Sequence, residues 1–179
     1  MVHGFDIQEQ LITDGERLTA LCADESLSSL VQLKHADVLQ TEGDLAPKPG
    51  PYDGGYSILV WLHLKEKEAL AKRAADLLRS GSTLYLEDYA LPDEYAGEGD
   101  LGTLPEDAKT WLARDVYCNR LITKSEWKAL LEDAGFTDVI VEDVSAKWTA
   151  FVSSRHAGFT ADIETHRKSV SYTHLTLPT

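Results

Sequence analysis

The sequence predicts an α/β domain with a mostly parallel sheet, and three observations lead to that prediction. Short apolar runs of strand length alternate along the chain with segments whose apolar residues recur at the 3.6-residue period of a helix. The 179 residues suffice for one ordinary domain but not comfortably for two. With 43% hydrophobic and 26% charged residues, the composition is that of a globular chain. Strand–helix alternation in such a chain is typical of parallel strands joined by helices.

The first predicted elements are a strand, a helix and a second strand. Val2 to Phe5 is a short apolar run that predicts a strand, and Asp6 follows it directly. Residues 8–22 carry apolar and small side chains on one face, which predicts a helix. Leu30 to Leu33 predicts the second strand, which ends before Asp37. Each of these two strands is therefore followed within a few residues by an aspartate.

The next strand, helix and strand follow a turn-rich stretch. The run from Tyr56 to Leu62 is almost wholly apolar, which is the composition of a strand buried on both faces. Residues 65–79 predict a helix, because their leucines and alanines recur at helical spacing. Gly81 stands where this helix is expected to end. Thr83 to Leu86 predicts another strand.

The segment from Glu87 to Asp107 differs in composition from the rest of the chain. It contains eight acidic residues, no Lys or Arg, two prolines and three glycines. We interpret it as a long loop, and long loops inside compact domains are usually functional or mobile. Its charge fits a substrate that arrives or leaves as a cation. The alternative is a solvated surface loop that only aids solubility.

The C-terminal part predicts helices around one more strand. Trp111 to Tyr117 is expected to be helical. Thr123 and Glu126 have the spacing of a capping box, so the following helix is expected to begin there. Thr137 to Val144 predicts a strand, with a final helix after it.

Charge and cysteine usage exclude several classes of function. There are 17 Lys plus Arg against 30 Asp plus Glu, and a net charge of −13 argues against nucleic acid and anionic membranes as partners. No apolar run reaches the roughly 18 residues of a spanning helix, and the first residues do not resemble a secretion signal. Cys22 and Cys118 form neither a disulfide framework nor a zinc pattern, so no metal site is expected. We expect a soluble, cytoplasmic protein.

Asp6 and Asp37 follow predicted strands at the edge where open parallel sheets bind ligands. The Asp6 carboxylate could accept hydrogen bonds from both ribose hydroxyls of a nucleoside cofactor. Its alternative role is to cap the following helix. Asp37 could accept the exocyclic amine of adenine, or it could be an ordinary turn aspartate.

His63 and the pair Asp88-Tyr89 follow the next two predicted strands. A neutral imidazole at His63 could act as a general base, or the residue could be a half-buried structural histidine. The Tyr89 hydroxyl could orient a substrate, or the ring could simply pack with an exposed edge.

Five segments of the chain, taken together, match the strand ends of one known family. They are Gly4-Phe5-Asp6, Ala36-Asp37-Val38, Tyr52 to Leu70, Leu77 to Tyr89 and Leu130 to Val139. In this order, over roughly 140 residues, they resemble the second to fifth strands and the junction before the sixth strand of class I S-adenosylmethionine-dependent methyltransferases. The resemblance implies a Rossmann-like fold with S-adenosylmethionine as cofactor. It also implies that the cofactor is bound by Asp6, Ile7, Asp37 and Val38.

Within that family, the sequence is most similar to small-amine N-methyltransferases of the phosphoethanolamine or sarcosine/dimethylglycine type. This finer resemblance is carried by Leu62-His63-Leu64, by Asp88-Tyr89 and by Glu142-Asp143-Val144 followed by Trp148. It implies that His63 is the catalytic residue and that Tyr89 binds the substrate.

The substrate-binding segment departs from the phosphobase branch of that group. Where that branch has an Arg and a Tyr for phosphate, this sequence has Tyr117 and Asn119. Arg114 and Arg120 are nearby, and either could hold a substrate carboxylate as a fork. We therefore expect the substrate to be bound by Tyr89, Arg114, Tyr117 and Arg120.

The resemblance also implies that the fold is incomplete. The family's first strand with its glycine-rich loop should precede Val2, and its last strand should follow the end of the chain. We expect residues 1–168 to form a partial class I methyltransferase domain. Residues 169–179 are Thr-rich and continue no pattern, so we interpret them as a non-native or disordered tail.

The function that we expect is methyl transfer from S-adenosylmethionine to a small-molecule amine by the parent enzyme. We expect the fragment alone to be inactive. The alternatives are an O-methyltransferase of a small metabolite and a non-catalytic interaction module with a cofactor fold. A nicotinamide dehydrogenase is another alternative, because its fingerprint also precedes an acidic residue at the end of the second strand. It is the weaker one, because the sequences around His63 and around Gly135-Phe136 favour a methyltransferase. The oligomeric state is not predicted.

Overall fold

The computed structural model describes residues 1–21, 25–40, 45, 51–95, 101 and 104–163. The interpretation of residues 169–179 as a tail falls outside these residues. The chain divides into two compact units, Met1–Val139 and Ile140–Thr179.

The first unit begins with a strand, two helices and a second strand. They are β1 (Val2–Asp6), α1 (Glu9–Ala20), α2 (Glu25–Ser28) and β2 (Val31–His35). β1 and β2 pair in parallel, with Asp6 opposite His35. A Cβ atom on Gly15 would lie 2.5 Å from a methyl carbon of Leu33, so the glycine is what allows α1 to lie this close to β2. The predicted strands and helix of this region are confirmed.

The second parallel pair is formed by β3 (Tyr52–Ile58) and β4 (Leu78–Glu87), with Ile58 opposite Glu87. Between them lie η1 (Trp61–His63), a single 3-10 turn, and α3 (Lys67–Leu77). The predicted helix and the predicted strand at Thr83 to Leu86 are confirmed, but the helix already ends at Leu77, and Gly81, which was expected at its end, lies within β4.

The prediction of a strand from Tyr56 to Leu62, buried on both faces, is wrong in two respects. β3 ends at Ile58, and the buried Trp61 and Leu62 belong to η1. Tyr56 on β3 and its partner Tyr85 on β4 are exposed by 71% and 53%. Among the described residues, helices cover one face of the β3–β4 pair, and Tyr56 and Tyr85 do not lie on that face. The end of the apolar run is buried in the turn η1 and not in the strand.

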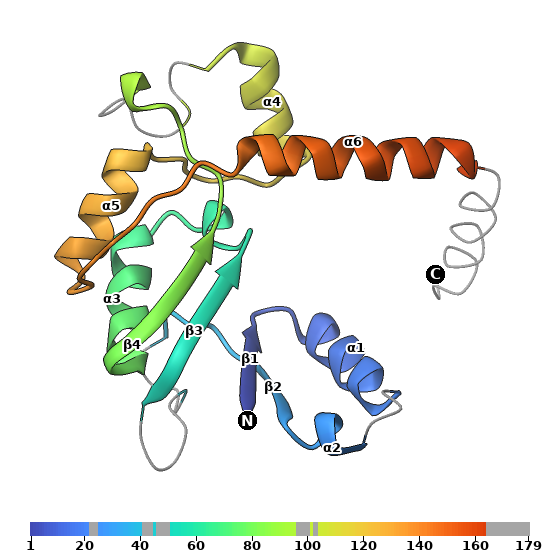
Figure 1. The fold of residues 1–179 in the computed structure, drawn as a ribbon, viewed down its shortest axis with the longest axis vertical. Helices are drawn as coiled ribbons and strands as arrows, with labels where there is room; N and C mark the ends of the chain where they lie inside the picture. The colour runs from blue at the N-terminus through green and yellow to red at the C-terminus, as the bar shows by residue number, and fades with distance from the viewer. Residues whose placement is uncertain (22–24, 41–44, 46–50, 96–100, 102–103, 164–179) are drawn as a thin grey trace. The chain divides into compact units, whose positions relative to one another are not determined.

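That covered face carries the main hydrophobic core. Trp61 of η1, Leu70 and Ala71 of α3, and Trp127 and Leu130 of α5 (Lys124–Asp133) form a buried cluster with Ile122. Leu84 and Leu86 of β4 pack against this cluster. In Figure 1, α3 and α5 lie side by side next to the β3–β4 pair. The core thus holds the carboxyl ends of β3 and β4 in place.

The long acidic segment contains the turn η2 (Asp93–Tyr95) and leads into α4 (Glu106–Arg114). α4 begins five residues earlier than the predicted helix at Trp111 and ends before Tyr117. α5 begins with the predicted capping box: Thr123 Oγ1 accepts from the Glu126 N–H, and Glu126 Oε2 accepts from the Thr123 N–H. That prediction is confirmed.

The predicted strand at Thr137 to Val144 is wrong. This stretch has no strand structure, and Ile140 is 89% exposed. Among the described residues no neighbouring strand pairs with it, and an apolar alternation without a ladder partner does not make a strand.

The second unit contributes one described helix, α6 (Ser145–Ala161), which confirms the predicted final helix. None of its 17 residues is buried. No helix in the described part of the chain combines the length and the apolar character that crossing a bilayer requires.

The strand pairing confirms the predicted fold class. The described strands form two parallel pairs, with no ladder between the pairs in this part of the chain. A Rossmann-like sheet has the strand order 3-2-1-4-5, so its second and third strands are neighbours, as are its fourth and fifth. β1–β2 and β3–β4 correspond to these two pairs. The chain therefore has the incomplete Rossmann-like α/β fold expected from its sequence.

Candidate functional site

The carboxyl edge of β1–β2 carries both aspartates that the sequence singled out. The Asp6 carbonyl accepts from the Ala36 N–H at 2.9 Å, so the residue directly before Asp37 lies beside the end of β1. Asp6 Oδ1 accepts from the Gln8 N–H at 2.7 Å, and Asp37 Oδ1 accepts from the Leu39 N–H at 2.9 Å. Both carboxylates are half-buried. For each, the second oxygen has no partner within the described residues, so it can accept from a ligand.

The structural alternative for Asp6 is correct only in part. Gln8 is the N-cap of α1 and makes no side-chain capping bond. Asp6 instead accepts from the N-cap backbone, which turns the chain from β1 into the helix. One carboxylate oxygen performs this turn function, and the other remains available.

Ile7 and Val38 flank the two aspartates in different surroundings. Ile7 is 63% exposed, and its carbonyl accepts from His35 Nε2 at 2.9 Å. Val38 packs against the cluster that contains Trp61, and its carbonyl accepts from Arg73 Nε at 3.3 Å. The segment after β2 is therefore joined through the core to the turn η1, which holds His63.

His63 is the last residue of η1 and is exposed. Its Nδ1 lies 3.1 Å from the Tyr117 carbonyl oxygen. Because a carbonyl only accepts hydrogen bonds, Nδ1 carries the proton, and Nε2 is left as the acceptor of the neutral ring. Nε2 has no partner among the described residues. The imidazole is thus oriented on one side and open on the other.

Asp88 and Tyr89 lie at the end of β4 next to this turn. Asp88 Oδ2 accepts from the Leu62 N–H at 3.0 Å, and Oδ1 accepts from the Tyr89 N–H at 2.7 Å. Burial raises the pKa of Asp88, although these backbone donors and the Lys67 charge act in the opposite direction. The Tyr89 carbonyl accepts from Trp127 Nε1 at 3.2 Å, and the Tyr89 side chain is 38% exposed.

The segment from Tyr117 to Arg120 crosses over η1. Tyr117 has a φ of +55°, which aims its carbonyl at His63, and its side chain is 71% exposed. The Asn119 N–H donates to the Leu62 carbonyl at 2.9 Å, and Asn119 Nδ2 donates to the His63 carbonyl. Sequence reasoning named Tyr117 as a substrate residue and did not foresee that its backbone orients His63.

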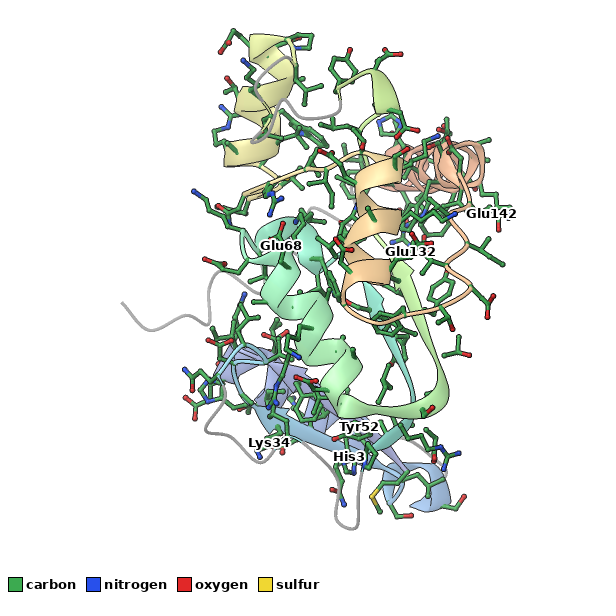
Figure 2. The ribbon with its side chains drawn as sticks, turned by 90° about the vertical axis from the view of Figure 1, so that its left-hand side faces the viewer. His3, Lys34, Tyr52, Glu68, Glu132 and Glu142 are labelled. Carbon is green, nitrogen blue, oxygen red and sulfur yellow. The ribbon has the colours of Figure 1, made fainter. Side chains whose placement is uncertain are left out.

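The two predicted arginines are both occupied by carboxylates of the chain itself. Arg120 forms a two-pronged pair with Glu68, at 2.8 and 2.9 Å, and also donates to the Lys65 carbonyl at 3.1 Å. The hydrogen bond from Arg120 lowers the pKa of Glu68, which Figure 2 labels on α3. Arg114 forms the same kind of fork with Asp115 at the exposed end of α4. Arg120 is tied to α3, the helix that follows the His63 turn, whereas Arg114 is paired within its own segment.

Lys67 is a residue of this site that sequence reasoning missed. Its side chain has no exposed surface, and its Nζ donates to the Trp61 carbonyl at 2.6 Å and to the Leu64 carbonyl at 3.0 Å. The ammonium also lies 5.5 Å from the ring centre of Trp127. Burial lowers the pKa of Lys67, and it raises the pKa of the neighbouring Cys118 thiol. A signal was present, because Lys67 precedes Leu70 and Ala71 by three and four residues and so falls on the apolar face of the predicted helix.

The structure therefore groups the predicted residues by strand pair. Asp6, Ile7, Asp37 and Val38 lie at the carboxyl edge of β1–β2. His63, Tyr89, Tyr117 and Arg120 gather around the carboxyl edge of β3–β4. No group of three or more His, Cys, Asp or Glu side chains in the described ranges could hold a metal ion. A hollow of about 510 Å³ opens between α1 and β2, and none of these residues lines it.

No protein-family profile and no curated protein matches the chain at a significant level. Solved structures do match. One is phosphoethanolamine N-methyltransferase 2 of Haemonchus contortus in complex with S-adenosyl-L-methionine, with a TM-score of 0.73 and 20% identity over 93% of this chain and 35% of that one.

Two further solved structures are similar. The O-methyltransferase from the trans-AT PKS multienzyme of Brevibacillus brevis, in complex with S-adenosyl-L-homocysteine, matches with a TM-score of 0.51 and 20% identity over 74% of this chain and 37% of that one. The YcgJ protein of Bacillus subtilis matches with a TM-score of 0.56 and 12% identity over 75% and 52%. The chain thus spans between about a third and a half of the length of these proteins. It has the Rossmann-like fold of S-adenosylmethionine-dependent methyltransferases.

Proposed function

We propose that the parent enzyme, of which this chain forms a part, transfers a methyl group from S-adenosylmethionine to a small-molecule amine. The observation that supports this most is the His63 imidazole. It stands at the carboxyl edge of a methyltransferase-type strand pair, with Nδ1 bound to the Tyr117 carbonyl and Nε2 open. An amine must lose its proton before its nitrogen can attack a methyl group, so an open and oriented base at this edge serves that chemistry.

The residues at the β1–β2 edge fit the cofactor by their chemistry. A nucleoside presents ribose hydroxyls and an exocyclic amine, all of which are hydrogen-bond donors. Asp6 and Asp37 each offer a half-buried carboxylate oxygen that accepts from nothing within the described residues. We propose that Asp6 binds the ribose and Asp37 the adenine amine, with Ile7 and Val38 beside them. When bound, S-adenosylmethionine supplies a methyl group on a positively charged sulfur.

On the substrate side, we propose that His63 Nε2 takes the proton of the amine. Tyr89 and Tyr117, both exposed, would orient the substrate through their hydroxyls. Arg120, which pairs with Glu68, and Arg114, which pairs with Asp115, are the residues that would hold a carboxylate of the substrate. Positioning of two reactants is the main contribution a protein makes to such a displacement.

The cofactor half of this proposal is tested by Asp6→Asn in the parent enzyme. The amide keeps an oxygen for the Gln8 N–H but loses the charge that strengthens a bond to a ribose hydroxyl. We expect the binding of S-adenosylmethionine, measured by calorimetry, to weaken by about 1.5–3 kcal/mol with an unchanged melting temperature. Asp14→Asn, an exposed carboxylate on α1, is the matched control and should bind like the unmodified protein. Equal affinity in both variants would leave Asp6 with its turn function alone.

O-methylation is the second candidate function, because the Brevibacillus brevis structure that matches 74% of this chain is an O-methyltransferase. An acceptor panel with a labelled methyl donor separates the two. Primary and secondary amines should become labelled under the proposal, whereas label on phenols or other hydroxyl compounds alone would favour O-methylation.

A further inference from the structure

We propose that Lys67 is a positioning residue for His63: its buried ammonium group binds the backbone carbonyls on either side of His63 and so fixes the direction of the imidazole. This inference rests on the proposed role of His63 as the base. Its test reads the imidazole itself and needs neither cofactor nor substrate, so it can fail or succeed independently of methyl transfer.

The contacts of Lys67 lie on both sides of the short segment Leu62-His63. The two acceptors of its Nζ are the carbonyls of Trp61, two residues before His63, and of Leu64, one residue after it. The side chain that reaches them starts from the first turn of α3 and is fully enclosed. An ammonium group with two short bonds to one turn fixes the backbone on both sides of His63.

Asp88 and the segment of Asn119 also hold the turn η1, and that segment includes Tyr117, whose carbonyl accepts from the His63 ring. Asp88 binds the Leu62 N–H, and Asn119 binds the carbonyls of Leu62 and His63. Asn119 follows Tyr117 by two residues, and Tyr117 provides the carbonyl for His63 Nδ1. A shift of η1 would therefore change the distance between the His63 ring and the Tyr117 carbonyl.

Packing alone does not explain a lysine at this place. Enclosing an ammonium group costs free energy that an apolar side chain of similar length would not cost. The chain offsets this cost with two carbonyls, the face of Trp127 and the nearby Asp88 charge. A methionine could fill the same space on the apolar face of α3, but it could not bind the carbonyls next to His63.

The decisive measurement is the tautomer of the neutral His63 ring, read by nitrogen NMR on the full chain with labelled histidine. The His63 signal is assigned by its loss in His63→Gln. In the unmodified protein we expect the Nδ1–H form, because the Tyr117 carbonyl accepts from Nδ1. In Lys67→Met we expect this form to fall to a minority, with the Nε2–H form that free histidine prefers taking its place.

Lys72→Met is the matched control, because Lys72 is on the same helix and its side chain is 74% exposed. It should keep the spectrum of the unmodified protein. If Lys67→Met does not fold, Lys67→Gln takes its place, since its neutral NH2 group can still donate to a carbonyl, and the Nδ1–H form should be lost only partly. A folded Lys67 variant that retains the Nδ1–H form in full would overturn the proposal. Failure of both variants to fold would also overturn it, because Lys67 would then be a residue of the core only.

Discussion

At the scale of single residues, the proposed chemistry depends on one atom, Nε2 of His63. Its ring is exposed, and Nδ1 is already bound to the Tyr117 carbonyl. We expect His63→Gln, made in the parent enzyme, to lower the turnover of methyl transfer by about 10²–10⁴-fold, which is the usual contribution of general acid–base catalysis. Cofactor affinity should stay the same, because Asp6 and Asp37 lie on the other strand pair.

Steady-state kinetics together with calorimetry checks this expectation. His156→Gln, an exposed histidine on α6, is the control and should keep full turnover. A His63→Gln protein with unchanged turnover but a lower melting temperature would make His63 a structural residue.

A second prediction at this scale concerns the Glu68–Arg120 pair and pH. Arg120 lowers the folded-state pKa of Glu68, so the pair stabilises the fold above the unfolded-state pKa, and this contribution is lost as pH falls through the folded-state value. Because the Glu68 side chain is 64% exposed, we expect Glu68→Gln to cost at most about 1 kcal/mol at about pH 7, and almost nothing at about pH 3.

Urea unfolding at several pH values measures this difference. Glu132→Gln is the matched control. Glu132 lies on α5 (Figure 2), and its carboxylate is 3.9 Å from the Lys128 ammonium group, so this ion pair is looser. It should cost less than Glu68→Gln at neutral pH. A cost for Glu68→Gln that persists at low pH would rule out the ion pair as its cause.

At the scale of elements, α5 is the helix whose beginning is best defined. Thr123 is fully buried, and its hydroxyl and the Glu126 carboxylate satisfy two backbone N–H groups at the helix start. We expect Thr123→Ala to lower the free energy of unfolding by about 1–2 kcal/mol, because it removes the cap and leaves a small cavity.

Thr110→Ala on α4 is the control for this substitution. The Thr110 hydroxyl is exposed and only donates to the Glu106 carbonyl within its own helix. Denaturant unfolding should show a change within about 0.5 kcal/mol for this variant. If both variants unfolded alike, the capping box would not contribute to the stability of α5.

At the scale of the whole molecule, the division into two units makes a prediction about truncation. No residue of α6 is buried, and Phe151, Val152 and Phe159 are each about half exposed. We therefore expect deletion of residues 140–179 to change the unfolding free energy of the remaining unit by no more than about 0.5 kcal/mol. Calorimetric melting of the two proteins checks this, and a large drop in melting temperature would show that the second unit supports the first.

Much of the fold could be predicted from the sequence, because it depends on neighbours along the chain. The alternation of strand and helix patterns, the capping box at Thr123 and the turn aspartates after β1 and β2 are all set by residues within a few positions of one another. The same local logic placed Asp6, Asp37 and His63 after strands, which is why these candidates could be named in advance.

By itself, then, the sequence determined the fold class and the strand ends near Asp6, Asp37 and Asp88, whereas the strand expected to lead to His63 ends earlier, at Ile58. Only the tertiary structure decided that Lys67 is enclosed against the carbonyls around His63, that Arg120 is bound by Glu68 52 positions away, and that Thr137 to Val144 has no strand to pair with. The physical reason is the same in each case. Ion pairing, ladder formation and the full enclosure of a side chain depend on which distant segments come into contact, and a local pattern indicates at most the face of a helix on which a residue lies.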